Sequence, residues 1–71
     1  MGSSPIKVFI NGDLKKFPQE TNIASVLEIL NISSKHIAIE INENLIFRLD
    51  WEKTNIKDGD NVEIVKAIGG G

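Results

Sequence analysis

The sequence predicts an α+β domain in which a mixed sheet of about five strands packs on one main helix. Two observations support this prediction. Several short segments, bounded by turn residues, place their apolar residues at every second position, and one segment repeats its apolar residues with the period of a helix. The 71 residues, 41% hydrophobic and 25% charged, have the composition of one small globular domain. Because the sequence has no cysteine and one histidine, neither disulfides nor a zinc cluster can stabilise it, and the core must be aliphatic.

Residues 6–10 predict the first strand, because their isoleucines and valine share one face and Phe9 lies on the other. The dipeptide Asn11-Gly12 follows and is the strongest short-range signal for a two-residue hairpin turn. We therefore expect Leu14–Phe17 to return as the second strand.

The helix is expected to start at a cap formed by Thr21 or Asn22 and to stop at Asn31. Between these residues the apolar side chains recur with the period of a helix and form one stripe that can face the sheet. This stripe consists of Ile23, Val26, Leu27 and Leu30.

Ile37–Ile41 predicts a third strand with its isoleucines on one face. A turn at Asn42–Asn44 then leads into a short strand at Leu45–Phe47. Asp50 is expected to cap a brief helical turn that follows.

A tight turn at Asp58–Asp60 precedes the last predicted strand, Val62–Ile68. The order β-β-α-β-β-β fits the β-grasp architecture, in which the final strand lies beside the first in the middle of the sheet. The domain would then span residues 6–68, after a disordered stretch or cloning remnant at residues 1–5 and before a flexible tail at residues 69–71.

The sequence ends with three glycines, Gly69, Gly70 and Gly71. Glycine packs poorly in a strand, but a backbone without side chains can enter a narrow channel and deliver a terminal carboxylate to another protein. Three extended residues reach roughly 10 Å, about the depth of a buried catalytic centre. The alternative interpretation is a frayed or engineered end.

The parity of the last predicted strand places Val65 and Ala67 on the outer sheet face, which they share with Phe9. Together with Ile68, these residues form a candidate docking surface for a partner at the root of the tail. The alternative is that they are ordinary exposed apolar residues.

The sequence favours a protein that other proteins act on, rather than an enzyme. Its single histidine, His36, opens a strand and is expected to be solvated, and the carboxylates are scattered, so we expect no catalytic or metal site. A formal net charge of -2 argues against nucleic acid as a partner, and no apolar run is long enough to cross a membrane. Trp51 is expected to cover one end of the core, and Arg48 to pair with Asp50 or Glu52.

Several segments together resemble the ThiS family of sulfur carriers in thiamine biosynthesis, which are ubiquitin-like β-grasp proteins. The matching segments are residues 10–12, 39–42, 47–51 and 56–65 and the terminal glycines, so the resemblance spans the chain apart from residues 1–5. The Asp-Gly-Asp turn that leads to Val-Glu-Ile-Val and a Gly-Gly end is typical of the wider carrier group. The spacing from Arg48 to Trp51 favours the thiamine branch.

The resemblance implies a function for the tail. A ThiF-like adenylyltransferase would use ATP and Mg²⁺ to join the carboxylate of Gly71 to AMP, and the chain itself would bind no cofactor. A persulfide, from a cysteine desulfurase or another donor, would displace AMP and leave a thiocarboxylate. A ThiG-like thiazole synthase would take sulfur from it, in the cytoplasm or, in a eukaryote, the plastid stroma.

Three alternatives remain open from the sequence. The first is a MoaD-like small subunit of molybdopterin synthase, which keeps the fold and the activation and changes the recipient. The second is a ubiquitin-like modifier of lysine side chains. The third is a β-grasp domain that binds partners non-covalently and does not need its terminal glycines.

Overall fold

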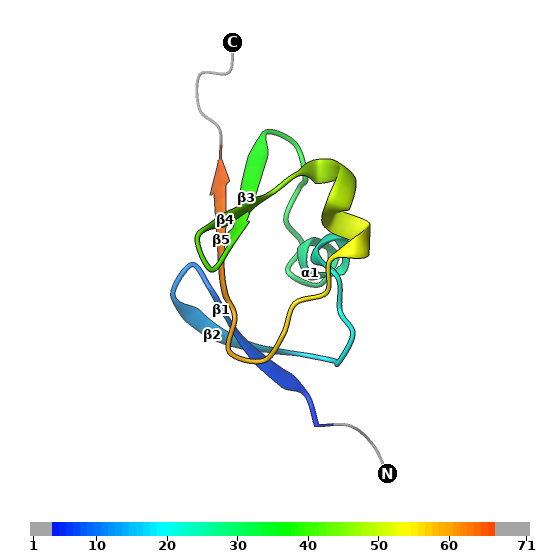
Figure 1. The fold of residues 1–71 in the computed structure, drawn as a ribbon, viewed down its shortest axis with the longest axis vertical. Coiled ribbons are helices and arrows are strands. Elements are labelled where there is room, and N and C mark those ends of the chain that lie inside the picture. The colour runs from blue at the N-terminus through cyan, green and yellow to red at the C-terminus, as the bar shows by residue number, and fades with distance from the viewer. Residues whose placement is uncertain (1–3, 67–71) are drawn as a thin grey trace.

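A computed structural model describes residues 4–66 of the chain. The elements are β1 (Ile6–Ile10), β2 (Asp13–Phe17), α1 (Ile23–Ile29), β3 (Ile37–Ile41), β4 (Asn44–Ile46), the 3-10 helix η1 (Arg48–Lys53) and β5 (Asn61–Lys66). Figure 1 shows α1 and η1 on one side of the strands. The predicted α+β class, with a mixed five-stranded sheet on one main helix, is confirmed.

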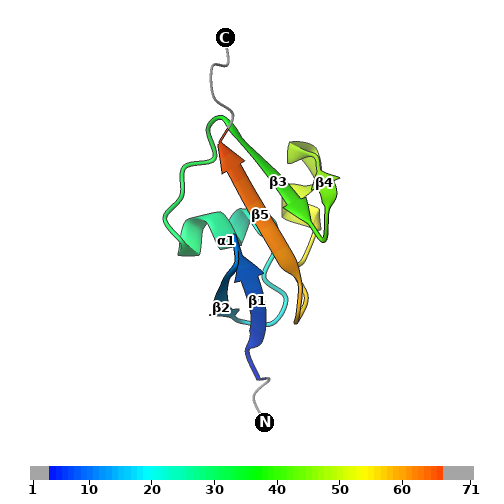
Figure 2. The ribbon, with the colours of Figure 1, turned by 90° about the vertical axis from the view of Figure 1, so that its left-hand side faces the viewer.

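The strands follow the order β2-β1-β5-β3-β4 in one sheet. β5 runs parallel to β1 and antiparallel to β3, and the two outer pairs are antiparallel hairpins. Figure 2 shows β5 crossing the middle of the sheet, with α1 behind it. The last strand therefore lies beside the first, as the β-grasp prediction requires.

The first hairpin forms where the sequence predicts it. Asn11 (φ 50°) and Gly12 (φ 90°) make its two-residue turn, and both have the positive φ that favours asparagine and glycine. The turn pairs Ile10 with Asp13, so the second strand starts at Asp13, one residue before its predicted start at Leu14.

Asn22 is the residue that caps α1. Its Oδ1 accepts a hydrogen bond from the backbone N–H of Ser25 at 2.7 Å. Thr21, the other candidate, is buried instead, and its hydroxyl donates to the carbonyl of Pro18 at 2.6 Å.

The β3–β4 turn is shorter than predicted. Only Asn42 (φ 51°) and Glu43 (φ 70°) turn the chain, so β4 already begins at Asn44 and the predicted strand at Leu45–Phe47 is shifted by one residue.

Asp50 does not cap the helical turn that follows β4, and that prediction was wrong. The 3-10 helix η1 is capped by the extended residue Phe47, without a side-chain hydrogen bond. Asp50 lies inside the first turn, where its N–H donates to the carbonyl of Phe47 at 2.8 Å. The physical reason is that a 3-10 turn closes over three residues, so the chain can enter it directly from the strand.

The turn before the last strand is confirmed. Gly59 has φ 88°, and the N–H of Asp60 donates to the carbonyl of Lys57 at 3.0 Å. β5 starts at Asn61, one residue before its predicted start; its predicted end at Ile68 lies outside the described residues.

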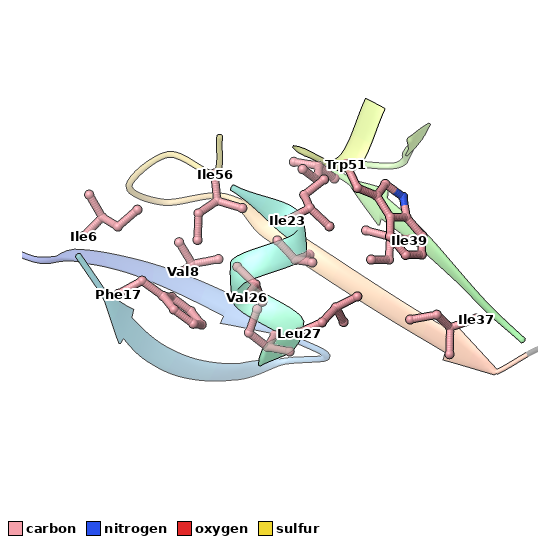
Figure 3. Packing of buried hydrophobic residues seen from close by; sticks show 13 residues of the cluster. Ile6, Val8, Phe17, Ile23, Val26, Leu27, Ile37, Ile39, Trp51 and Ile56 are labelled. Atoms are coloured by element: carbon pink, nitrogen blue, oxygen red, sulfur yellow. The ribbon is translucent and has the colours of Figure 1, made fainter. Parts of the chain in front are cut away.

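The core lies between the sheet and α1 and is apolar throughout (Figure 3). Val8, Phe17, Ile23, Val26 and Ile39 are its most deeply buried side chains. Trp51 closes one end as predicted: it is 5% exposed, and its indole N–H donates to the carbonyl of Ile46 at 3.0 Å. The functional surface must therefore be sought outside this core.

Candidate functional site

The three tail glycines, Gly69, Gly70 and Gly71, lie outside the described residues. The structure bears on the tail through β5, the strand that precedes it. β3 pairs with β5 from Val62 to Lys66, whereas β1 pairs only with Asn61 and Val62. β5 is thus held on both sides at its start and by backbone pairing to β3 alone near its end.

Phe9 and Val65, two residues of the candidate docking surface, are 38% and 50% exposed on the sheet face turned away from α1. Their shared face confirms the parity prediction for these two residues; Ala67 and Ile68 lie outside the described part. Phe9 stands opposite Asn61, four residues before Val65 on the neighbouring strand. At about 3.3 Å per residue, this separates them by roughly 13 Å along the strands, and Glu63 comes between them on the same face.

Leu14 is an exposed apolar residue of this face that the sequence interpretation missed. It stands directly opposite Phe9 in the first hairpin and is 54% exposed. The signal for it was present, because a two-residue turn at Asn11-Gly12 fixes this register. The outer face thus carries an apolar pair near the start of β5 and Val65 near its end.

Between these apolar residues the outer face is acidic. Glu40 on β3 stands directly opposite Glu63 on β5. Together with Glu43 from the β3–β4 turn, they line a hollow of about 450 Å³. This part of the face presents negative charge to any partner.

On the helix side, Arg48 does not make the predicted pairing with Asp50 or Glu52. Its guanidinium donates to the carbonyl of Ser34 at 2.8 Å and stacks over Trp51, 4.4 Å from the ring centroid. Arg48 therefore ties η1 to the loop after α1 and is a structural residue.

His36 is exposed, and its backbone adopts φ 58° just before β3. Within residues 4–66, no three His, Cys, Asp or Glu side chains are grouped to hold a metal ion. In the same residues, every buried side-chain nitrogen or oxygen has a hydrogen-bond partner. No helix among them is long and apolar enough to cross a membrane.

A model of the ThiS family matches residues 8–71, which include β5 and the three terminal glycines. Among solved structures, the crystal structure of the thiamine biosynthesis protein ThiS from Geobacter metallireducens superposes with a TM-score of 0.82. It is 26% identical in sequence, and the match covers 93% of this chain and 100% of that one.

Curated relatives include a protein with the ThiS name. The sulfur carrier protein ThiS of Thermus thermophilus is 31% identical over 64 residues, which are 90% of this chain and 98% of that protein. The uncharacterized protein ycf40 of Porphyra purpurea is 36% identical over 66 residues, 93% of each chain. A thiazole synthase of Paramagnetospirillum magneticum is 32% identical over 66 residues, which are 93% of this chain but only 20% of that larger protein.

Proposed function

The chain belongs to the ThiS family, and on this premise we propose that it carries sulfur for thiamine biosynthesis on the carboxylate of Gly71. The observation that carries the proposal is the family match, which extends over the whole tail to Gly71. The fold supports it, because a central strand is a firm mount for a tail that has to reach into another protein. The five residues after Lys66 can span up to about 17 Å.

The proposed chemistry needs activation because a carboxylate repels nucleophiles and has no good leaving group. A ThiF-like adenylyltransferase joins the Gly71 carboxylate to AMP from ATP, with Mg²⁺, and pyrophosphate leaves. The terminal sulfur of a persulfide then attacks the acyl carbon and AMP leaves. A thiol cleaves the resulting S–S bond, which yields the thiocarboxylate and a disulfide.

The partner enzymes supply the catalysis, and this chain supplies presentation. Gly69, Gly70 and Gly71 enter the partner's channel, where a β-carbon would clash. The outer-face residues Phe9 and Val65, together with Ala67 and Ile68, dock the carrier. The persulfide comes from a cysteine desulfurase or another donor, and the reactions take place in the cytoplasm or plastid stroma.

The proposed sulfur recipient is a ThiG-like thiazole synthase. The support for it is the relative of that name, a fifth of whose length is similar to nearly all of this chain. A carrier that passes its sulfur directly to a thiazole synthase would benefit from being part of the same polypeptide. A carrier-like segment within a thiazole synthase therefore supports this recipient.

The test is to incubate the chain with a ThiF-like enzyme, Mg-ATP and a persulfide donor, and to measure its intact mass. We expect the replacement of one oxygen by sulfur, and no replacement when the Gly71 carboxylate is amidated. An unchanged mass, with an enzyme that activates another carrier, would overturn the proposal. Transfer of the sulfur to molybdopterin synthase in place of thiazole synthase, or covalent adducts on lysines, would assign the chain to another branch of the carrier group.

A further inference from the structure

Asn11, the residue that follows β1, binds β5 through both its backbone and its side chain. Its N–H donates to the carbonyl of Val62 at 2.9 Å, the last backbone hydrogen bond on this side of β5. The chain then turns at φ 50°. From this position the side chain binds Ile64 twice: Oδ1 accepts from its N–H at 2.8 Å, and Nδ2 donates to its carbonyl at 3.1 Å.

The carboxamide of Asn11 replaces backbone groups that a longer β1 would supply. Its oxygen and one of its N–H groups point the same way, so this one side chain gives Ile64 the acceptor and the donor that would otherwise come from two peptide groups of a parallel strand. Asparagine also tolerates positive φ better than other residues that have side chains. The same residue can therefore make the hairpin turn and hold the neighbouring strand.

Asn42 holds the other end of β5, from the β3 side. Its N–H donates to the carbonyl of Asn61 at 2.8 Å, and its Oδ1 accepts from the N–H of Asn61 at 3.0 Å. Its Nδ2 donates to Oδ1 of Asp60, in the turn before β5, at 3.0 Å. It too is the first residue of a two-residue turn, with φ 51°. Asn42 thus holds the first residue of β5, and Asn11 holds a residue only two positions before Lys66.

Figure 2 shows β5 extending past the end of β1, and β5 ends at Lys66. In this stretch the backbone pairs only with β3, at Val65 with Ala38 and at Lys66 with Ile37. On the β1 side, the hydrogen bonds that hold Ile64 come from the Asn11 side chain. Asn11 therefore holds the last part of β5 on the side that β3 does not cover.

We propose that Asn11 is a positioning residue for activation of the tail, because it fixes the end of the strand from which residues 67–71 continue. The inference rests on the proposed function. If the end of β5 is loose, it must be ordered each time the tail enters a partner's active site, and this ordering weakens binding. The chemistry in the bound complex is unchanged, so the loss should appear in KM and not in kcat.

The test compares Asn11→Gly with Asn42→Gly. Glycine accepts positive φ, so both variants keep their turn, and each loses its side-chain hydrogen bonds to β5 or the adjacent turn. The three measurements are unfolding in urea, amide exchange at Val65, and KM and kcat for adenylation by a ThiF-like enzyme with Mg-ATP. Asn42 is the matched control because it holds the same strand at the end away from the tail.

We expect both variants to lose a similar part of their stability, while only Asn11→Gly speeds exchange at Val65. Its KM should rise about five- to tenfold, as expected for the loss of one or two hydrogen bonds, with kcat within about twofold of wild type. Asn42→Gly should leave KM within about twofold of wild type.

Equal KM values for the two variants would overturn the inference, whether both rise or neither does. A rise in KM for Asn11→Gly without faster exchange at Val65 would also overturn it, because it would point to direct contact between Asn11 and the partner. If the wild-type chain is not adenylated at all, the proposed function fails, and the exchange data alone decide whether Asn11 fixes the end of β5.

Discussion

Glu40 and Glu63 stand directly opposite each other on β3 and β5, two carboxylates in one cross-strand pair on the outer face of the sheet. Like charges in this arrangement destabilise an antiparallel pair. Glutamine keeps the size of the side chain and removes the charge. We therefore expect Glu63→Gln to raise the free energy of unfolding by about 0.2–1 kcal/mol, measured by urea denaturation at low ionic strength.

The control for this prediction is the second member of the pair. Glu40→Gln should give a similar gain, and the double variant little more, because either single change already removes the repulsion. High salt should reduce the differences by screening. Fully additive gains would show that the two charges do not interact.

Glu43 occupies a turn position that suits glycine. It has φ 70° at the second position of the β3–β4 turn, where the first hairpin has Gly12 at φ 90°. A left-handed backbone strains residues with a β-carbon by about 1–2 kcal/mol, and glycine loses part of this advantage through its unfolded-state entropy. We expect Glu43→Gly to raise the free energy of unfolding by up to about 1 kcal/mol.

Two variants separate backbone strain from charge. Glu43→Gln removes the charge but keeps the strain, so it should gain less than Glu43→Gly. Gly12→Ala should lower the melting temperature, although its new β-carbon meets no atom within 4 Å, because the backbone conformation alone is unfavourable. If Glu43→Gly melts below wild type, the strain argument is wrong.

The sequence predicted the local elements well because their signals are local. Alternation in residues 6–10, the Asn11-Gly12 turn and the helix cap depend on neighbours a few positions away. The first two are confirmed, and of the two cap candidates, Thr21 and Asn22, the structure selects Asn22. One local prediction was wrong, at the start of a helix where neighbouring residues compete for the cap position. Asp50 is a good cap by residue type, but the chain entered the 3-10 turn earlier, from Phe47.

Long-range contacts could not be predicted in this way. The opposition of Glu40 and Glu63 depends on the register of two strands that are distant in sequence. The hydrogen bonds from Asn11 to Ile64 join residues 53 positions apart. For the candidate site, parity placed Phe9 and Val65 on one face, but only the register of β1 against β5 shows that Glu63 lies between them.

The docking role of the outer face can be tested at Val65. An aspartate there places a charge in an apolar contact, so we expect Val65→Asp to raise KM for adenylation at least about fivefold, the effect of losing a contributing interface residue. Leu49→Asp is the matched control, because Leu49 is 88% exposed on η1, on the other side of the molecule. It should leave KM within about twofold of wild type.

Stability must be measured alongside, because aspartate disfavours strands. Val65→Thr keeps the β-branched shape and should fold like wild type while still weakening docking. If all three variants are adenylated like wild type, the partner does not use this part of the face.

The tail prediction separates folding from activation. Among residues 4–66, the buried apolar cluster runs from Ile6 to Val62, so Gly70→Ala and Gly71→Ala remove no side chain from it and should leave the melting temperature nearly unchanged. In the partner's channel the added β-carbon would displace the reacting carboxylate, and kcat/KM for adenylation should fall at least about tenfold.

Gly59→Ala is the converse control: at φ 88° in an open turn, alanine should lower the melting temperature but leave adenylation of the folded protein intact. The two kinds of variant should therefore show opposite patterns of melting and activation. If Gly70→Ala has the same melting temperature and the same kcat/KM for adenylation as wild type, the channel does not require a bare backbone at that residue.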